Sequence, residues 1–201
     1  MKKTLTVLLA LVLVIAMSVA GTMAYLTDDA SVTNTFTVGS VAITLDETDV
    51  DVYGVKDGET RVDKNTYRLI PGHTYVKDPV IHFQPDSEAS WLFVKLENGI
   101  KDIVDAKTIE NQILDKGWAL LSGTENVYYK AADANNDPDA KVVDYPVFDN
   151  FKLTSNANVA AYDGLTIKVT AYAVQMDSFE NDPVKAWTTT FGAPAAPTPA
   201  P

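Results

Sequence analysis

The order of apolar and polar residues along the chain is typical of a protein built from short β-strands. Val41, Ile43 and Leu45 alternate with small or polar residues, and this period of two indicates a strand with one buried face. The apolar runs at 79–83 and 91–96 are denser. Strands of that density are usually covered on both faces, as between the two sheets of a sandwich.

Turn residues divide the rest of the chain into further short segments. We expect more strands at 34–38, 66–70, 73–76, 118–121, 127–130, 141–147 and 165–176. Apolar residues at mixed spacings over 99–116 predict one or two short inserted helices, and one further helical turn is expected around Pro183. Many short strands with little helix favour an all-β fold, a jelly-roll β-sandwich.

The alternation changes phase near residue 39. Phe36 and Val38 are the apolar positions before Gly39, whereas Val41 and Ile43 follow on the opposite parity. A glycine at such a change indicates a bulge or a place where the chain leaves one sheet for another. The segments before and after residue 39 therefore need not lie in the same sheet.

The N-terminus has the three parts of a secretory signal peptide. Lys2 and Lys3 precede an apolar run at 5–20, and small residues at Thr22 and Ala24 follow it. This pattern predicts a signal peptide at 1–24, cleaved between Ala24 and Tyr25. A permanent membrane anchor is the alternative, although the run is shorter than the roughly 20 residues that a spanning helix needs.

Composition excludes several kinds of chemistry. The net charge is −11, and removal of Lys2 and Lys3 with the signal peptide brings it to −13. Such an acidic chain lacks the clustered positive charge that nucleic-acid binding requires. The absence of cysteine excludes disulfides and thiolate metal sites. The Ala/Pro-rich end at 193–201 predicts a disordered tail, or alternatively an extended spacer.

Few residues suggest a metal or catalytic site, and we expect no enzymatic activity and no required cofactor. Oxygen-bearing residues at calcium-loop spacing are Asp133, Asn135, Asp137, Asp139 and Asp144. Pro138 stands where such a loop needs glycine, so we favour a solvated acidic loop over a calcium site. A second acidic run, at 46–51, is expected to be a solvated strand end, with divalent-cation binding as the alternative. His73 and His82 lie outside any HExxH helix, so no zinc ligand set is visible.

Motifs in a fixed order along most of the chain resemble those of one family. They are GTMAYLTD at 21–28, NTFTVGSV at 34–41, LIPG at 69–72 with KDP at 77–79, WLFVK at 91–95, AYAVQ at 171–175 and AW at 186–187. The chain resembles the TasA/camelysin family of Gram-positive bacteria. The insertion at 101–117 is the region without a close counterpart.

The resemblance implies a secreted structural protein that polymerises into extracellular fibres of the biofilm matrix. It implies processing by a SipW-type signal peptidase, and partners that include further copies of the chain and accessory fibre or matrix proteins. Subunits of this family join by donor-strand complementation, which divides the mature chain into a donor segment at 25–38 and a sandwich domain at 39–192. The expected donor residues are Tyr25, Leu26, Val32, Phe36 and Val38.

Two alternatives stay open. The segment at 25–38 can pair within its own domain as an ordinary edge strand. The protein can also be a monomeric, cell-wall-associated module that binds glycan or protein, in which Trp91, Trp118 and Trp187 would line a sugar-binding face, although tryptophan is more often a core residue.

Overall fold

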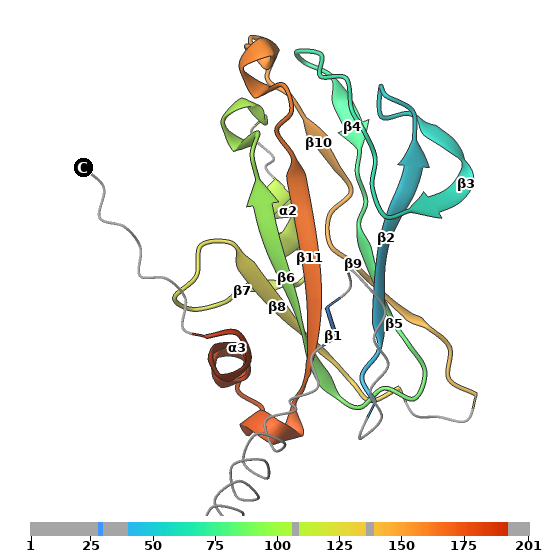
Figure 1. The fold of residues 1–201 in the computed structure, drawn as a ribbon, viewed down its shortest axis with the longest axis vertical. Helices are drawn as coiled ribbons and strands as arrows, with labels where there is room; N and C mark the ends of the chain where they lie inside the picture. Colours follow the sequence, from blue (N-terminus) through green and yellow to red (C-terminus); the bar gives the residue numbers. More distant parts are fainter. Residues whose placement is uncertain (1–27, 30–39, 106–108, 136–138, 193–201) are drawn as a thin grey trace, which may run out of the picture.

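A computed structural model describes residues 28–29, 40–105, 109–135 and 139–192, which form a β-sandwich elongated along its strands (Figure 1). The first sheet has the strand order β1-β11-β6-β8-β7 and the second the order β3-β2-β5-β9, while β10 and β4 form a separate pair. The strands are β1 (Asp28–Asp29), β2 (Ile43–Val50), β3 (Lys56–Val62), β4 (Thr74–Val76), β5 (Val80–Phe83), β6 (Ser90–Asn98), β7 (Ala119–Leu120), β8 (Val127–Ala132), β9 (Val143–Pro146), β10 (Asn150–Lys152) and β11 (Ile167–Gln175). The helical segments are η1 (Lys101–Ile103), α2 (Ile109–Asp115), η2 (Val159–Tyr162), η3 (Asp177–Phe179) and α3 (Pro183–Phe191).

Every strand pair is antiparallel, and β6 and β11 form the longest one. They pair from Ile167 opposite Asn98 to Gln175 opposite Ser90. Because side chains alternate across a strand, every second residue of each points into the space between the sheets. In the second sheet, β5 lies between β2 and β9, with Ile81 opposite both Leu45 and Tyr145.

The main hydrophobic core fills the space between the two sheets. Ile81 and Phe83 from one sheet and Leu92 and Val94 from the other are fully buried there. Trp118 lies in the same cluster, and its indole N–H donates to the carbonyl oxygen of Pro146 at 3.0 Å. This contact joins the segment before β7 to β9, on the side of the sandwich opposite β11.

A second cluster lies on the outer face of the first sheet, under α3. Phe93 and Val174 point outward from β6 and β11 and pack with Trp187 of the helix. Asp182 begins α3 as its N-cap, since its carboxylate accepts hydrogen bonds from the backbone N–H groups of Val184 and Lys185. The helix therefore covers an apolar face that would otherwise be exposed to solvent.

The structure confirms the expected all-β sandwich with short helical inserts, but some predicted elements differ. The expected strand at 66–70 is wrong, because this segment is a loop in which Tyr67 and Leu69 pack on the core. The strands β3 and β10 were not expected. The segment β3 carries mostly exposed polar side chains, so it has no hydrophobic alternation to reveal it. The helix α3 extends over 183–191 where a single turn was expected.

Several predicted segments lie outside the described residues. These are the signal peptide at 1–24 with its cleavage site, most of the donor segment at 25–38, and the tail at 193–201. Among the residues that the structure does describe, no helix has the length and apolar character needed to cross a membrane.

Candidate functional site

One edge of the first sheet is largely open. The strand β11 pairs with β6 along its whole length on one side. On its other side it pairs only with β1, where Asp28 lies opposite Ala173 and Asp29 opposite Tyr172. Within the described part of the chain, the backbone edge from 167 to 171 has no strand partner. An unpaired edge of this kind is a template for an added strand.

A groove lies between this open edge and the second sheet. Its cavity has a volume of about 990 Å³, and Ile167 and Val169 of β11 line one wall while Leu45 of β2 lines the other. Tyr67 and Phe151 add an aromatic surface, with ring centroids 5.4 Å apart in an edge-to-face arrangement. An unpaired strand edge beside an apolar groove can accept both the backbone and the alternate side chains of an extended segment.

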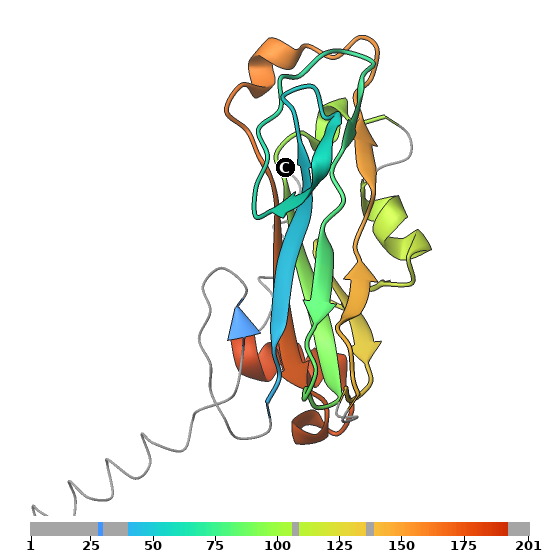
Figure 2. The ribbon, with the colours of Figure 1, turned by 90° about the vertical axis from the view of Figure 1, so that its right-hand side faces the viewer.

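The groove and β1 occupy different ends of the same edge. In Figures 1 and 2, β1 lies in the lower half of the molecule, whereas β3 and the loop with η2 lie in its upper half. The groove-lining residues come from the upper half: residues 63–69 follow β3, residues 159–166 contain η2, and Ile167 begins β11. The N-terminal strand therefore approaches β11 below the groove.

The pairing of β1 with β11 bears directly on the predicted donor segment. Asp28 and Asp29 pair with their own domain, as the alternative of an ordinary edge strand requires for these two residues. The predicted donor residues Tyr25, Leu26, Val32, Phe36 and Val38 all lie outside the described residues. Their roles stay predictions.

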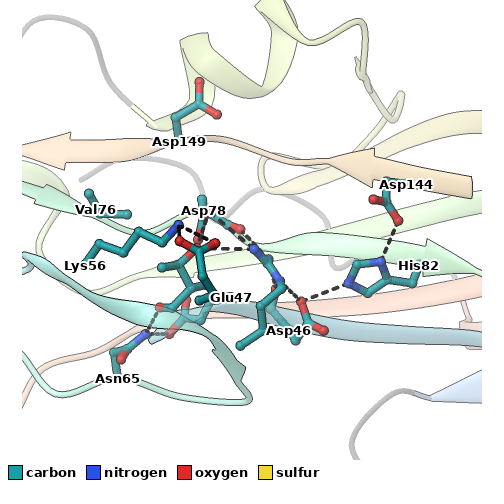
Figure 3. Close-up of polar contacts among 12 residues, drawn as sticks. Asp46, Glu47, Lys56, Asn65, Val76, Asp78, His82, Asp144 and Asp149 are labelled. Atoms are coloured by element: carbon teal, nitrogen blue, oxygen red, sulfur yellow. Dashed lines mark hydrogen bonds and ion pairs between the residues drawn. The ribbon is translucent and has the colours of Figure 1, made fainter. Parts of the chain in front are cut away.

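The outer face of the second sheet carries a chain of charged side chains across its four strands. His82 of β5 contacts Asp46 of β2 through Nε2 at 2.9 Å and Asp144 of β9 through Nδ1 at 2.6 Å (Figure 3). Arg61 of β3 pairs with the other side of Asp46 and with Asp78. These ion pairs thus connect both edge strands of the second sheet, β3 and β9, to its two central strands.

These contacts shift the pKa values of the groups involved. Partial burial alone would lower the pKa of His82, but its hydrogen bonds to Asp46 and Asp144 and their negative charges outweigh burial and raise it. Burial alone would raise the pKa of Asp46, yet hydrogen bonds from Arg61 and His82 hold it below the ordinary value. The imidazolium form of His82 is therefore stabilised between two carboxylates.

A second polar cluster lies in the wall of the groove. The Nζ atom of Lys77 is 2.5 Å from Oε2 of Glu47, and both residues are buried. The amide of Asn65 donates to Oε1 of Glu47 at 3.0 Å. The charge of Glu47 adds to the effect of burial in raising the pKa of the neighbouring Tyr67 phenol. The groove wall thus combines apolar side chains with a buried ion pair.

These two clusters correct the interpretation of the acidic run at 46–51 as a solvated strand end. Asp46 is bound by Arg61 and His82, and Glu47 lies in the groove wall with Lys77. A signal for Glu47 was present, because Ile43, Leu45 and Glu47 share one parity and thus one face of the strand. The partners on β3, β5 and the segment after β4 could not be found from local spacing.

Two of the candidate calcium ligands, Asn135 and Asp144, make other contacts in the structure. The amide of Asn135 donates to the carbonyl oxygen of Lys141 at 2.8 Å, and Asp144 binds His82. The imidazole of His73 lies 2.8 Å from the carbonyl oxygen of Tyr53. Asp137 lies outside the described residues, which contain no group of three or more histidine, aspartate or glutamate side chains that could hold a metal ion.

The three tryptophans do not share one face. Trp118 lies in the core between the sheets, and Trp187 is buried in the outer cluster under α3. Trp91 packs edge-to-face on Tyr129 beside that outer cluster. No common sugar-binding face is formed by these side chains.

The described residues form an all-β sandwich in which part of the β11 edge has no strand partner. The family model described as camelysin metallo-endopeptidase matches residues 1–69 of the 201, the part of the chain that holds the first motifs resembling the TasA/camelysin family. It covers the N-terminal junction, β2, β3 and the loop that lines the groove. No curated protein and no solved structure matches the chain.

Proposed function

We propose that the mature chain is a secreted, non-enzymatic subunit of an extracellular fibre, and that its subunits join by donor-strand complementation. Residues 25–38 of one subunit would insert into the groove of the next and pair with the free edge of its β11, for which Asp28 and Asp29 would first have to leave their pairing with β11 of their own domain. The observation that carries the proposal is this open edge, which lies directly above the position of β1 and beside an apolar groove.

The positions of donor and acceptor support a linear polymer. The strand β1 pairs near the C-terminal end of β11, whereas Ile167 and Val169 line the groove at its N-terminal end. Donor and acceptor are thus different surfaces of the same subunit. An interface between two different surfaces is heterologous, and it forms an open filament unless its rotation closes a ring.

The alternation of the donor segment would suit the groove if the donor kept, on the next subunit, the parity that β1 has on β11 of its own domain. Asp28 lies opposite Ala173, whose side chain is buried in the core between the sheets. Because residues of one parity share a face, Leu26, Val32, Phe36 and Val38 would follow the parity of Asp28 in a continuous strand. An extended donor in this phase would present its apolar residues to the groove.

A charge placed in the groove tests this function. Val169→Asp would put a carboxylate into the groove wall that receives the donor, whereas Val142→Asp makes the same change at an exposed position that does not line the groove. We expect Val169→Asp to slow fibre formation by about tenfold or more, because an unpaired charge is costly to bury, and Val142→Asp to assemble at nearly the wild-type rate.

Electron microscopy and sedimentation of the mature proteins would measure assembly, and circular dichroism would check that each variant is folded. Equal assembly of folded Val169→Asp and wild-type protein would contradict the groove as the acceptor. If the wild-type protein stays monomeric across concentration, pH and seeding, the alternative of a wall-associated binding module replaces the fibre.

A further inference from the structure

The buried cluster in the groove wall contains the groups needed to form an amide bond between two side chains. We propose that Lys77 and Asn65 become joined by an isopeptide bond, with Glu47 as the proton carrier. This modification is independent of the proposed fibre function, since it requires only groups within one folded chain.

The Lys77 amine, which is the nucleophile, and the Asn65 amide, which is the electrophile, both contact the carboxylate of Glu47, which can act as the base. Oε2 of Glu47 contacts Nζ of Lys77 at 2.5 Å, and Oε1 accepts a hydrogen bond from Nδ2 of Asn65 at 3.0 Å. A single side chain can therefore remove a proton from the amine and deliver one to the amide nitrogen that leaves. This is the arrangement that general acid–base catalysis of acyl transfer needs.

The carbonyl group of Asn65 is held and polarised by the backbone. Its Oδ1 accepts a hydrogen bond from the N–H of Val50 at 3.1 Å, and its Nδ2 also donates to the carbonyl oxygen of Thr48 at 2.8 Å. When an amine attacks Cγ, negative charge develops on Oδ1. The N–H of Val50 is already aimed at that atom and would stabilise the charge.

The surroundings favour a reaction over a permanent ion pair. The side chains of Lys77 and Glu47 are only 10% and 6% exposed, and the aromatic rings of Tyr67 and Phe151 line the same groove. Burying two charges is costly, and apolar side chains of similar size often stabilise a protein equally well or better. Conversion to a neutral amide would remove both the buried ammonium charge and the need for its partner to stay ionised.

The reaction balances without any oxidant or cofactor. Glu47 takes a proton from the ε-ammonium group, and the neutral Nζ attacks Cγ of Asn65. The new Nζ–Cγ bond forms, Glu47 gives the proton it took to Nδ2, the Cγ–Nδ2 bond breaks, and Glu47 takes up the second Nζ proton. The product is an amide between the two side chains, and Asn65 loses its nitrogen as ammonia, which leaves with the proton that Glu47 carried.

The mass of the protein provides the test. Intact-mass spectrometry of the folded, purified chain should give a mass lower than that of its amino-acid sequence by one ammonia molecule. Proteolysis after denaturation should yield a branched peptide that joins the Asn65 and Lys77 segments. A full sequence mass, together with an unmodified Lys77 amine in the denatured protein, would overturn the proposal.

Variants separate this reaction from other losses of ammonia. Asn65→Ala and Glu47→Gln should each restore the full expected mass and abolish the branched peptide, while the exposed control Asn156→Ala should retain both signatures. A branched peptide that persists in Glu47→Gln would contradict the role of Glu47. Because the wild-type measurement stands alone, a variant that fails to fold does not leave the proposal undecided. A monomeric protein that carries the bond would refute the fibre and support the crosslink.

Discussion

Among single residues, His82 links the edge strand β9 to β2, because its imidazole binds a carboxylate on each of these strands. Both imidazole nitrogens face carboxylates, Asp144 on one side and Asp46 on the other, and Arg61 lies beyond Asp46. The raised pKa of His82 makes this contact a source of stability that depends on pH. Loss of the positive charge on His82 would therefore weaken the attachment of the edge strand β9.

Replacing His82 should remove that dependence. Because folding raises the pKa of His82 above its ordinary value of 6.5, the stabilisation is fully present below that value and is lost as the pH rises through the raised one. We expect the melting temperature of His82→Gln to lie below that of the wild type in mild acid, with the difference shrinking as the pH increases. Thermal unfolding of both proteins from about pH 5.5 to about pH 9 measures this.

A melting-temperature difference that does not shrink with rising pH would contradict the stabilising role of the His82 charge. If the difference between wild type and His82→Gln grows with pH, or is constant, the charged form of His82 does not stabilise the fold. A titration of the His82 ring by NMR gives an independent measure, since its midpoint should lie above the ordinary pKa of histidine.

The residue pattern predicts which face of a strand a side chain occupies better than it predicts which distant residue that side chain contacts. The shared parity of Ile43, Leu45 and Glu47 is enough to place Glu47 on the inner face of β2. It does not identify Lys77 as the partner, because that contact joins residues thirty positions apart. Long-range contacts depend on how the sheets stack, and local spacing carries no information about stacking.

Among the elements, α3 covers the outer face of the first sheet, and its first turn is stabilised by the N-cap residue Asp182. Asp182→Ala should destabilise the protein by about 1 kcal/mol, because two backbone N–H groups of the first turn lose their acceptor. Asp57→Ala, which removes the same charge from an exposed position on β3, should have almost no effect. Chemical denaturation of both variants measures the difference. Equal losses for the two would show that the cap contributes nothing specific.

The prediction of elements succeeded where one face of a segment is buried. Strands β5, β6 and β11 pack on the core, so their hydrophobic patterns were visible before the fold was known. The strand β3 was missed because its polar side chains are exposed and it forms only by pairing with β2. The loop at 66–70 has strand-like composition, yet Tyr67 packs on Phe151 instead of joining a sheet. Tertiary packing overrides local propensity in both cases.

At the scale of the whole molecule, net charge opposes assembly. If the chain is cleaved after Ala24, the mature subunit carries a charge of −13, and like-charged subunits repel each other. Added salt shortens the range of this repulsion to about 3 Å at 1 M, and acid moves the chain towards its isoelectric point near 4.5. We therefore expect faster fibre formation at higher salt and at lower pH.

Light scattering and sedimentation of the mature protein would measure this dependence. A folded variant that is expected to assemble slowly, such as Val169→Asp, should show a much slower rise in scattering, which separates ordered assembly from precipitation near the isoelectric point. Assembly that is insensitive to both salt and pH would show that charge repulsion is not what limits it.

In the proposed fibre, residues 25–38 join one subunit to the next through the groove beside β11. Electron microscopy of mature protein with and without this segment, at matched concentration and pH, tests it most directly. We expect fibres from the complete mature chain and only monomers from the shortened one, with circular dichroism confirming that both sandwich domains are folded. Fibres of the same form and abundance from the shortened protein would contradict it.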